Sequence, residues 1–263
     1  MTPPAITSKT ATKPESGPPQ PRQFTFEEYC DYEDGTDNRY ELVQGYLRLM
    51  TSPAGLHILI CEFLVYVFNQ LFQKTGISLW AVREVGVRTS ENTSRIVDIC
   101  VNQRDRWQQL FQPGEKGIFQ QERTPLLVVE VASTNEKEDY EEKYRDYAAM
   151  GIPEYWIVNS RREQVRVCTA SHPGAPYVYR DFVKGERIVS KVLPQLALPV
   201  DVVLNPPAVS QLVEQDQAQQ AAEIEQARKQ AAASEQRAAE MEEMLARYQA
   251  QFGNLDTSTS NNE

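Results

Sequence analysis

The stretch from Leu126 to Trp156 constrains the fold most, because it reads as strand, helix and strand in direct succession. Its opening residues, LLVVEVAS, form an apolar, Val-rich run that is typical of a buried strand. Glu136–Met150 contains no Gly or Pro and spaces its tyrosines three and four residues apart, which predicts an amphipathic helix. Gly151 suits the C-terminal cap of that helix, and Glu154–Val158 is predicted as the next strand.

Short strands and a few helices fill the rest of the central region. The predicted elements are a capped helix at Thr25–Tyr32, a hairpin over Arg39–Met50, a helix from His57 to Phe72, strands at Ser78–Arg88 and Arg95–Val101, a short helix near Trp107–Phe111 and an antiparallel meander over Gln164–Val192. This succession indicates an α/β fold with mixed strand pairing around one core, in which helices flank the sheet.

Two appendages are expected outside this core domain, which we place at residues 23–206. Residues 1–22 hold six of the sixteen prolines and few apolar side chains, so they are predicted to be a disordered tail. The segment 207–252 is dominated by Ala, Gln and Glu and lacks Gly and Pro from Ala208 onward, which predicts one long helix. Residues 253–263 are expected to form a second disordered tail.

The predicted long helix at 207–252 carries a heptad pattern. Its two rows are Ile224, Ala231, Ala238 and Leu245, and Ala227, Ser234, Met241 and Tyr248. Such a seam is typical of a coiled coil, which would join copies of the chain into a homo-oligomer. Because the seam is rich in Ala, a solvated single helix is the alternative.

The formal charge of −10 weakens a nucleic-acid-binding hypothesis without excluding it. From Ala208 onward there are ten Asp or Glu residues against four Lys or Arg, so −6 of the total belongs to the C-terminal segment. The remaining charge is mild, and acids in a metal site would be neutralised in part by the bound cations.

Cysteine usage and hydropathy predict a cytoplasmic protein. The four cysteines are widely spaced, at Cys30, Cys61, Cys100 and Cys168. They form no CxxC pair, so we interpret them as reduced structural thiols rather than as a zinc site or disulfides. The N-terminus lacks the apolar core of a signal peptide, and polar residues interrupt the most apolar stretch, Ile58–Phe72, so no membrane span is expected.

Three carboxylates fall inside predicted strands: Asp98 in RIVDICV, Glu130 in LLVVEVAS and Glu41 in RYELVQG. A charge in a buried strand is costly unless it is paired or binds a metal. Solvation at a strand end, or a partner such as Arg95, would explain each acid singly. Acids that converge without a cationic partner instead favour a bound divalent cation, Mg²⁺ or Mn²⁺, which prefers oxygen ligands. Such an ion polarises a phosphate and lowers the pKa of bound water.

These motifs and their order resemble the Uma-two family of restriction-endonuclease-like proteins, within the PD-(D/E)XK nuclease superfamily. The order is YELVQG, a loop with His57, RIVDICV, LLVVEVAS and EDYEEKYRDYAAMGIPEYWIVN, and the resemblance covers Phe24–Leu204. It implies a restriction-endonuclease-like fold, DNA as the partner and metal-dependent hydrolysis of phosphodiester bonds. The alternative is a catalytically inactive nuclease-like binding or scaffold module, assembled through its C-terminal helix.

The resemblance also implies roles for individual residues. Asp98 and Glu130 would be the metal-binding carboxylates, and Glu41 the additional acid of the N-terminal element. The lysine usual two residues after the Glu is absent, because that position is Ala132, and the following helix offers Lys143 instead. Its neighbours on the predicted apolar face favour an inward direction. A pairing with Asp139 or Asp146 on the helix surface is the alternative.

Two further residues are candidates for supporting roles. His57 is interpreted either as a structural or capping histidine, or as a contact to phosphate or to a group near Glu41. Ser133 would hydrogen-bond a metal ligand or, as we favour, act locally at the start of the helix. One departure from the family pattern is Val97, where a Pro usually precedes the Asp; Pro supplies no metal chemistry.

Overall fold

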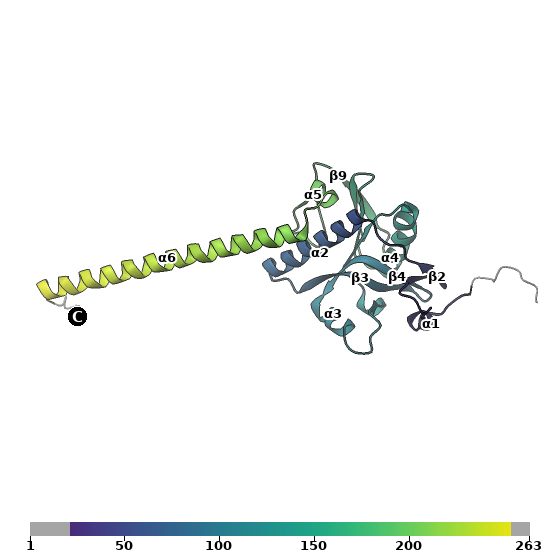
Figure 1. Cartoon of the computed structure of the whole chain (residues 1–263), viewed down its shortest axis with the longest axis horizontal. Coiled ribbons are helices and arrows are strands. Elements are labelled where there is room, and N and C mark those ends of the chain that lie inside the picture. The colour runs from purple at the N-terminus through teal and green to yellow at the C-terminus, as the bar shows by residue number, and fades with distance from the viewer. Residues whose placement is uncertain (1–21, 254–263) are drawn as a thin grey trace, which may run out of the picture. The chain divides into compact units, whose positions relative to one another are not determined.

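A long antiparallel hairpin, β3–β4, occupies the middle of the main sheet (Figure 1). The structure is a computed structural model that describes residues 22–253, so the predicted tails lie almost wholly outside the described residues. The strand order is β2-β1-β4-β6-β7-β8-β9, with β3 paired to β4 and β5 paired to β3. The bounds are β1 Tyr40–Val43, β2 Tyr46–Leu49, β3 Leu79–Ser90, β4 Thr93–Gln103, β5 Ile118–Phe119, β6 Leu127–Val131, β7 Glu154–Asn159, β8 Gln164–Thr169 and β9 Val178–Val183.

The strand pairing is mixed. The β6–β7 and β3–β5 pairs are parallel, and the other pairs of the main sheet are antiparallel. A small second sheet pairs β10, Arg187–Ile188, with β11, Leu198–Pro199. The parallel pair β6–β7 is the predicted strand–helix–strand unit, and the α/β class with mixed pairing is confirmed.

Helices pack on both faces of the main sheet. The bounds are α1 Phe26–Cys30, α2 Gly55–Thr75, α3 Arg104–Leu110, α4 Tyr144–Met150 and α5 Val200–Leu204, with a 3₁₀ turn at Gln121–Arg123. On one face α2 contacts β3, β4 and β6, and the ring of Phe68 meets that of Trp156 edge to face with centroids 5.7 Å apart. On the other face Tyr147 and Met150 of α4 share a core cluster with Val128 of β6.

Helix α2 is long and apolar enough, by length and composition, to cross a membrane. In the domain it has the position of a core helix: it contacts three strands, and six of its side chains are buried, from Ile60 to Phe72. A helix that covers one face of a sheet needs this apolar character. Gly76, with a φ of 70°, forms its left-handed C-terminal cap.

The β3–β4 pairing skips Glu84 and Asp98, which lie between the pairs Arg83–Ile99 and Val85–Val97, and its register shifts between Arg88 and Ser90. Glu84 has a φ of 54°, a left-handed conformation that costs a residue other than Gly roughly 1–2 kcal/mol. Val97 and Cys100 also face the same core cluster, although a regular strand turns residues three apart to opposite sides. The backbone therefore departs from regular alternation at the position of Asp98.

The helix predicted over Glu136–Met150 is present, but its middle is wider than an α-helix. A π-helical turn spans Glu138–Lys143 and leads directly into α4. The Tyr155 hydroxyl of β7 donates to the carbonyl oxygen of Asp139 at 3.0 Å and fastens this turn to the sheet. Inserted π turns are rare and recur at functional sites.

The described part of the chain divides into two compact units, with the boundary between Pro206 and Pro207. The second unit contains α6, Val209–Phe252, a continuous helix of 44 residues with no buried residue. The long helix predicted for this segment is therefore present. Pairing of this helix with another chain stays a prediction.

Candidate active site

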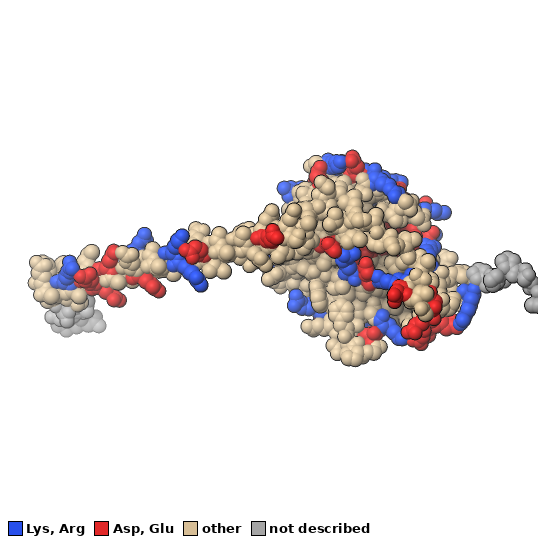
Figure 2. Space-filling view, in the orientation of Figure 1, with Lys and Arg blue, Asp and Glu red and all other residues tan. Residues whose placement is uncertain are grey.

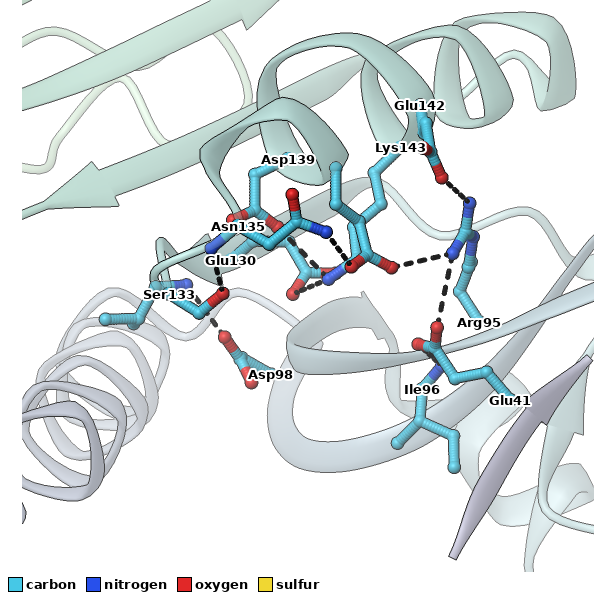
Figure 3. Close-up of polar contacts among 12 residues, drawn as sticks. Glu41, Arg95, Ile96, Asp98, Glu130, Ser133, Asn135, Asp139, Glu142 and Lys143 are labelled. Atoms are coloured by element: carbon cyan, nitrogen blue, oxygen red, sulfur yellow. Dashed lines mark hydrogen bonds and ion pairs between the residues drawn. The ribbon is translucent and has the colours of Figure 1, made fainter. Parts of the chain in front are cut away.

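Glu130 lies near the C-terminal end of β6 and points toward the helix that follows this strand (Figure 3). Its Oε2 accepts a hydrogen bond from Lys143 Nζ at 2.8 Å, and its Oε1 accepts one from the Tyr147 hydroxyl at 2.6 Å. Lys143 Nζ also lies 3.2 Å from Asp139 Oδ1. We call these four buried residues the Lys143 cluster. Lys143 thus points inward, as predicted, and binds Asp139 there rather than on the helix surface.

Asp98 lies beside this cluster, on the neighbouring strand β4. Its Oδ2 accepts a hydrogen bond from the backbone N–H of Val131 at 2.7 Å, next to Glu130 in the chain. Its Oδ1 lies 3.1 Å from His57 Nε2 at the start of α2. The Asp98 side chain is 18% exposed, against 2% for Glu130, so Asp98 is the more accessible acid.

The charges of these residues act on one another. Burial raises the pKa of Glu130, and Lys143 only partly offsets this effect. Burial raises the pKa of Asp139 for the same reason. Burial alone would lower the pKa of Lys143, but Glu130 and Asp139 outweigh it and hold this pKa above its usual value. Burial would raise the pKa of Asp98, but His57 and Lys143 outweigh it, so Asp98 is ionised near neutral pH.

Acidic groups outnumber cationic groups at this place in the fold. One ammonium, on Lys143, pairs with two carboxylates, Glu130 and Asp139, and the charge of a third, Asp98, also acts on it. With all of them ionised the group carries a net charge of −2 if His57 is neutral. A divalent cation would neutralise this excess, and the carboxylate oxygens are hard donors that suit it.

Arg95, also on β4, forms a second charged group (Figure 3). Its guanidinium lies 3.2 Å from Glu41, 2.9 Å from Glu138, 3.6 Å from Glu142 and 2.9 Å from Asp146. We call these five residues the Arg95 cluster. Glu41 also accepts a hydrogen bond from the N–H of Ile96 at 2.8 Å.

The Arg95 cluster answers whether the acids have cationic partners. A cationic partner such as Arg95 was left open as an alternative for each acid, and Arg95 is that partner for Glu41, whereas Glu130 pairs with Lys143. Arg95 does not pair with Asp98 or Glu130 among the described contacts. The charge of Glu41 nevertheless acts on Lys143, so the four predicted residues do lie in one neighbourhood.

His57, Cys61 and Asp98 form a second candidate metal group, with possible ligand atoms within 4.8 Å of one another. Burial raises the pKa of the Cys61 thiol, and hard divalent cations such as Mg²⁺ prefer oxygen ligands to sulfur. His57 contacts Asp98, and not the neighbourhood of Glu41 that was one prediction for it. All four cysteines are free thiols, as expected.

Ser133 has the local role that was favoured. Its hydroxyl oxygen accepts a hydrogen bond from the backbone N–H of Asn135 at 3.2 Å, just before the helix. Sequence reasoning missed Asp139 and Tyr147 as members of the site. Asp139 stands one helical turn before Lys143 and was considered only as a surface partner. Tyr147 is one of the spaced tyrosines that predicted the amphipathic helix, and its bond to Glu130 has no signal in that spacing.

An open hollow of about 890 Å³ lies next to the Arg95 cluster. Cationic residues on its walls include Arg48, Arg95, Lys137 and Arg145. Its walls also carry Glu141, Glu142 and Asp146, so both signs of charge are present. Asp98, Glu130 and Lys143 are not among its lining residues.

Comparisons with known proteins were consistent with one another. A family model, Uma2 (Uma-two), described as "Putative restriction endonuclease", matches residues 26–201. The chain is similar to a protein of Anabaena variabilis ATCC 29413 whose crystal structure is described as that of "a putative nuclease belonging to DUF820". The identity is 18% and the TM-score 0.55, over 69% of this chain and 97% of that chain, which shows a shared fold. Among curated proteins, no match was found.

Proposed function

The chain belongs to the Uma2 family, and from this premise we propose that it is a metal-dependent endonuclease that hydrolyses phosphodiester bonds of DNA. The observation that carries the proposal is the meeting of Asp98, Glu130 and Lys143, which come from β4, β6 and the π-helical turn. Acids brought together from separate elements, with an excess of negative charge, are typical of a cation-dependent site.

Asp98 and Glu130 would hold the metal, for which Mg²⁺ or Mn²⁺ fits the oxygen donors. A carboxylate has about four lone-pair positions. Asp98 uses one for the Val131 N–H and faces His57 with the other oxygen, and Glu130 accepts two hydrogen bonds, so both retain acceptor capacity. A divalent ion at such a site polarises the phosphate and lowers the pKa of bound water.

Lys143 would act as a fixed cation. Its raised pKa keeps the ammonium charged at neutral pH, so it donates hydrogen bonds rather than accepting a proton. Two of its three N–H donors face Glu130 and Asp139, which leaves the third for an attacking water or a phosphate oxygen. A preorganised donor of this kind stabilises negative charge that develops on the phosphate.

Glu41 would act indirectly. One of its oxygens faces Arg95 and the other accepts from the Ile96 N–H, so the acid holds Arg95 within reach of the π-helical turn. We assign it to positioning of the turn that carries Lys143. His57 would orient Asp98 in the same indirect way.

A nuclease-like scaffold without catalysis is the second candidate. The observation that favours it is the internal neutralisation of the acids, because Lys143 and Arg95 each pair with several carboxylates. Charges of both signs are also interspersed on the face drawn in Figure 2, which has no broad basic patch that would bind the DNA backbone. Such a module would bind partners without needing a metal.

The test is a nicking assay on supercoiled plasmid with Mg²⁺ or Mn²⁺, combined with calorimetry of metal binding. We expect cleavage by the natural chain, a loss on the order of a thousandfold in Asp98→Asn, and little change in the exposed control Asp105→Asn. Intact DNA together with absent heat of metal binding would overturn the nuclease proposal and leave the scaffold. Equal losses in both variants would overturn the assignment of Asp98.

A further inference from the structure

Helix α6 exposes large apolar side chains, at Ile224 and over its C-terminal third. Ile224 is 56% exposed, Met241 62%, Leu245 54% and Phe252 66%. A helix of this length without a buried face is stabilised either by ion pairs along its own surface or by packing against another helix. The segment also lies outside residues 26–201, which match the family model, so the family resemblance does not explain it.

The apolar side chains fall into a regular seam. Ile224, Ala231, Ala238, Leu245 and Phe252 follow one another at seven-residue intervals, and Ala227, Ser234, Met241 and Tyr248 form the second row. The rings of Tyr248 and Phe252 lie 4.8 Å apart, which places the ends of both rows on one face. Apolar residues in two such rows are the pattern of a left-handed coiled coil.

Charged residues next to the seam favour pairing with a second copy of α6 in the parallel direction. Glu223 precedes Ile224 and Arg228 follows Ala227, whereas Arg237 precedes Ala238 and Glu242 follows Met241. In a parallel, in-register pair of helices, a residue before the first row faces the residue five positions later on the partner. Glu223 would then face Arg228, and Arg237 would face Glu242, so both contacts join opposite charges.

The ion pairs within α6 lie on the other side of the helix. Glu225 pairs with Lys229 at 3.4 Å, and Glu243 pairs with Arg247 at 2.6 Å. These four residues occupy positions remote from the seam in the heptad. Arg228, Arg237 and Glu242 have no ion pair within the described part of the chain.

We propose that α6 binds α6 of a second copy of this chain as a parallel, in-register, two-stranded coiled coil. The large apolar residues at the ends of the two rows supply the contact area. The pairs between Glu223 and Arg228 and between Arg237 and Glu242 of the two copies fix direction and register. The Ala-rich middle of the seam permits close approach but buries little area, so the pair is held mainly by its C-terminal third.

A parallel pair has a consequence for the domain at 1–206. Because α6 begins at Val209, just after Pro206, parallel pairing joins two such domains at the same end of the coiled coil. Two candidate sites would then belong to one assembly, one for each strand of a DNA duplex. This consequence rests on the proposed function, but the pairing of α6 does not.

The experiment is sedimentation equilibrium of the full chain and three charge variants. We expect a dimer for the natural chain. Arg237→Glu and Glu242→Arg should each weaken dimerisation roughly tenfold, because two symmetric attractions become repulsions. The matched control Arg247→Glu, on the outer side of α6, should leave the dissociation constant within about twofold.

Mixing the variants tests direction and register. An equimolar mixture of Arg237→Glu and Glu242→Arg chains should form a heterodimer as stable as the natural dimer, because each altered charge meets its opposite. This rescue also shows that neither variant has misfolded. If the natural chain is a monomer, the pairing is overturned. If neither substitution weakens the dimer, or if the mixture of the two variants does not restore it, the parallel register is overturned. If the chain is a monomer that still nicks DNA in a metal-dependent way, the pairing proposal fails while the nuclease proposal stands.

Discussion

Arg95 and Lys143 are both buried cations held by several carboxylates, but the two clusters differ in what surrounds the cation (Figure 3). Arg95 is 1% exposed at its side chain, and three of its four acids are 16–30% exposed. Lys143 instead faces two acids that are 2% and 6% exposed. Buried acids resist ionisation, whereas acids near solvent do not.

The difference separates structure from chemistry. A guanidinium stays charged at any pH and joins several acids in fixed directions, so Arg95 ties β1, β4 and the π-helical turn together. An ammonium has three rotatable donors, and the acids around Lys143 have a raised pKa. The two acids of the Lys143 cluster are therefore protonated more readily than ordinary carboxyl groups, and they lie beside the more accessible Asp98.

Removal of Arg95 should have the largest effect on stability. Arg95→Met leaves Glu41 buried without its cation, which should lower the free energy of unfolding by about 3–5 kcal/mol in urea denaturation. The exposed control Arg180→Met, which loses a pair with Glu186, should lower it by less than about 1 kcal/mol. Equal effects in the two variants would show that the Arg95 cluster is not structural.

Removal of Lys143 should affect activity more than stability. Lys143→Met should reduce the rate of nicking about 10²–10³-fold, because a donor to the phosphate is lost. The loss of stability should be smaller than for Arg95→Met, since Glu130 and Asp139 take up protons when their cation is gone. Lys184→Met, which removes a cation paired with exposed Glu163, is the control. A variant that nicks DNA at the natural rate would remove Lys143 from the reaction.

His57 should matter through Asp98. His57→Leu removes the group that holds Asp98 Oδ1 and should lower kcat/KM about tenfold, whereas His57→Gln keeps a donor and should lower it less. The acid limb of the pH profile should move to higher pH in His57→Leu, because His57 lowers the pKa of Asp98. The only other histidine, exposed His172, gives the control His172→Leu. Identical profiles for all three variants would contradict this role.

Much of the fold follows from local patterns in the sequence. The Val-rich run of β6, the tyrosine spacing of the next helix and Gly151 as its cap are short-range signals, and the structure has these elements where they were predicted. The hairpin β1–β2 turns at Gln44–Gly45 for the same reason. Interrupted apolar runs likewise revealed Asp98 and Glu130 as unusual acids, because a buried charge stands out within its own strand.

The partners of these acids could not be predicted in the same way. Arg95 lies 54 residues from Glu41, and their contact depends on pairing of β1 with β4. The residue types of the π-helical turn do not distinguish it from an α-helix, although the turn sets the direction of Asp139 and Lys143. The sequence likewise gives no sign of the irregular backbone at Glu84, because Glu rarely adopts a positive φ. Long-range packing decides these features.

The pH dependence of stability is the finest test of the difference between the clusters. The pKa of Asp139 in the folded chain lies above its usual 3.8, so the folded state keeps this proton to higher pH than the unfolded state does. The stability of the natural chain relative to Asp139→Asn should therefore fall as pH rises above about 3.8, as measured by urea denaturation between pH 4 and 7. Asp34 provides a control of opposite sign, because hydrogen bonds from Thr36 and Tyr40 lower its pKa to about 2. Relative to Asp34→Asn, stability should be lost as pH falls from 3.8 toward 2. The stability difference between the natural chain and Asp139→Asn could instead stay constant or grow as pH rises. The Lys143 cluster would then be as fixed in charge as the Arg95 cluster, and the distinction between them would fail.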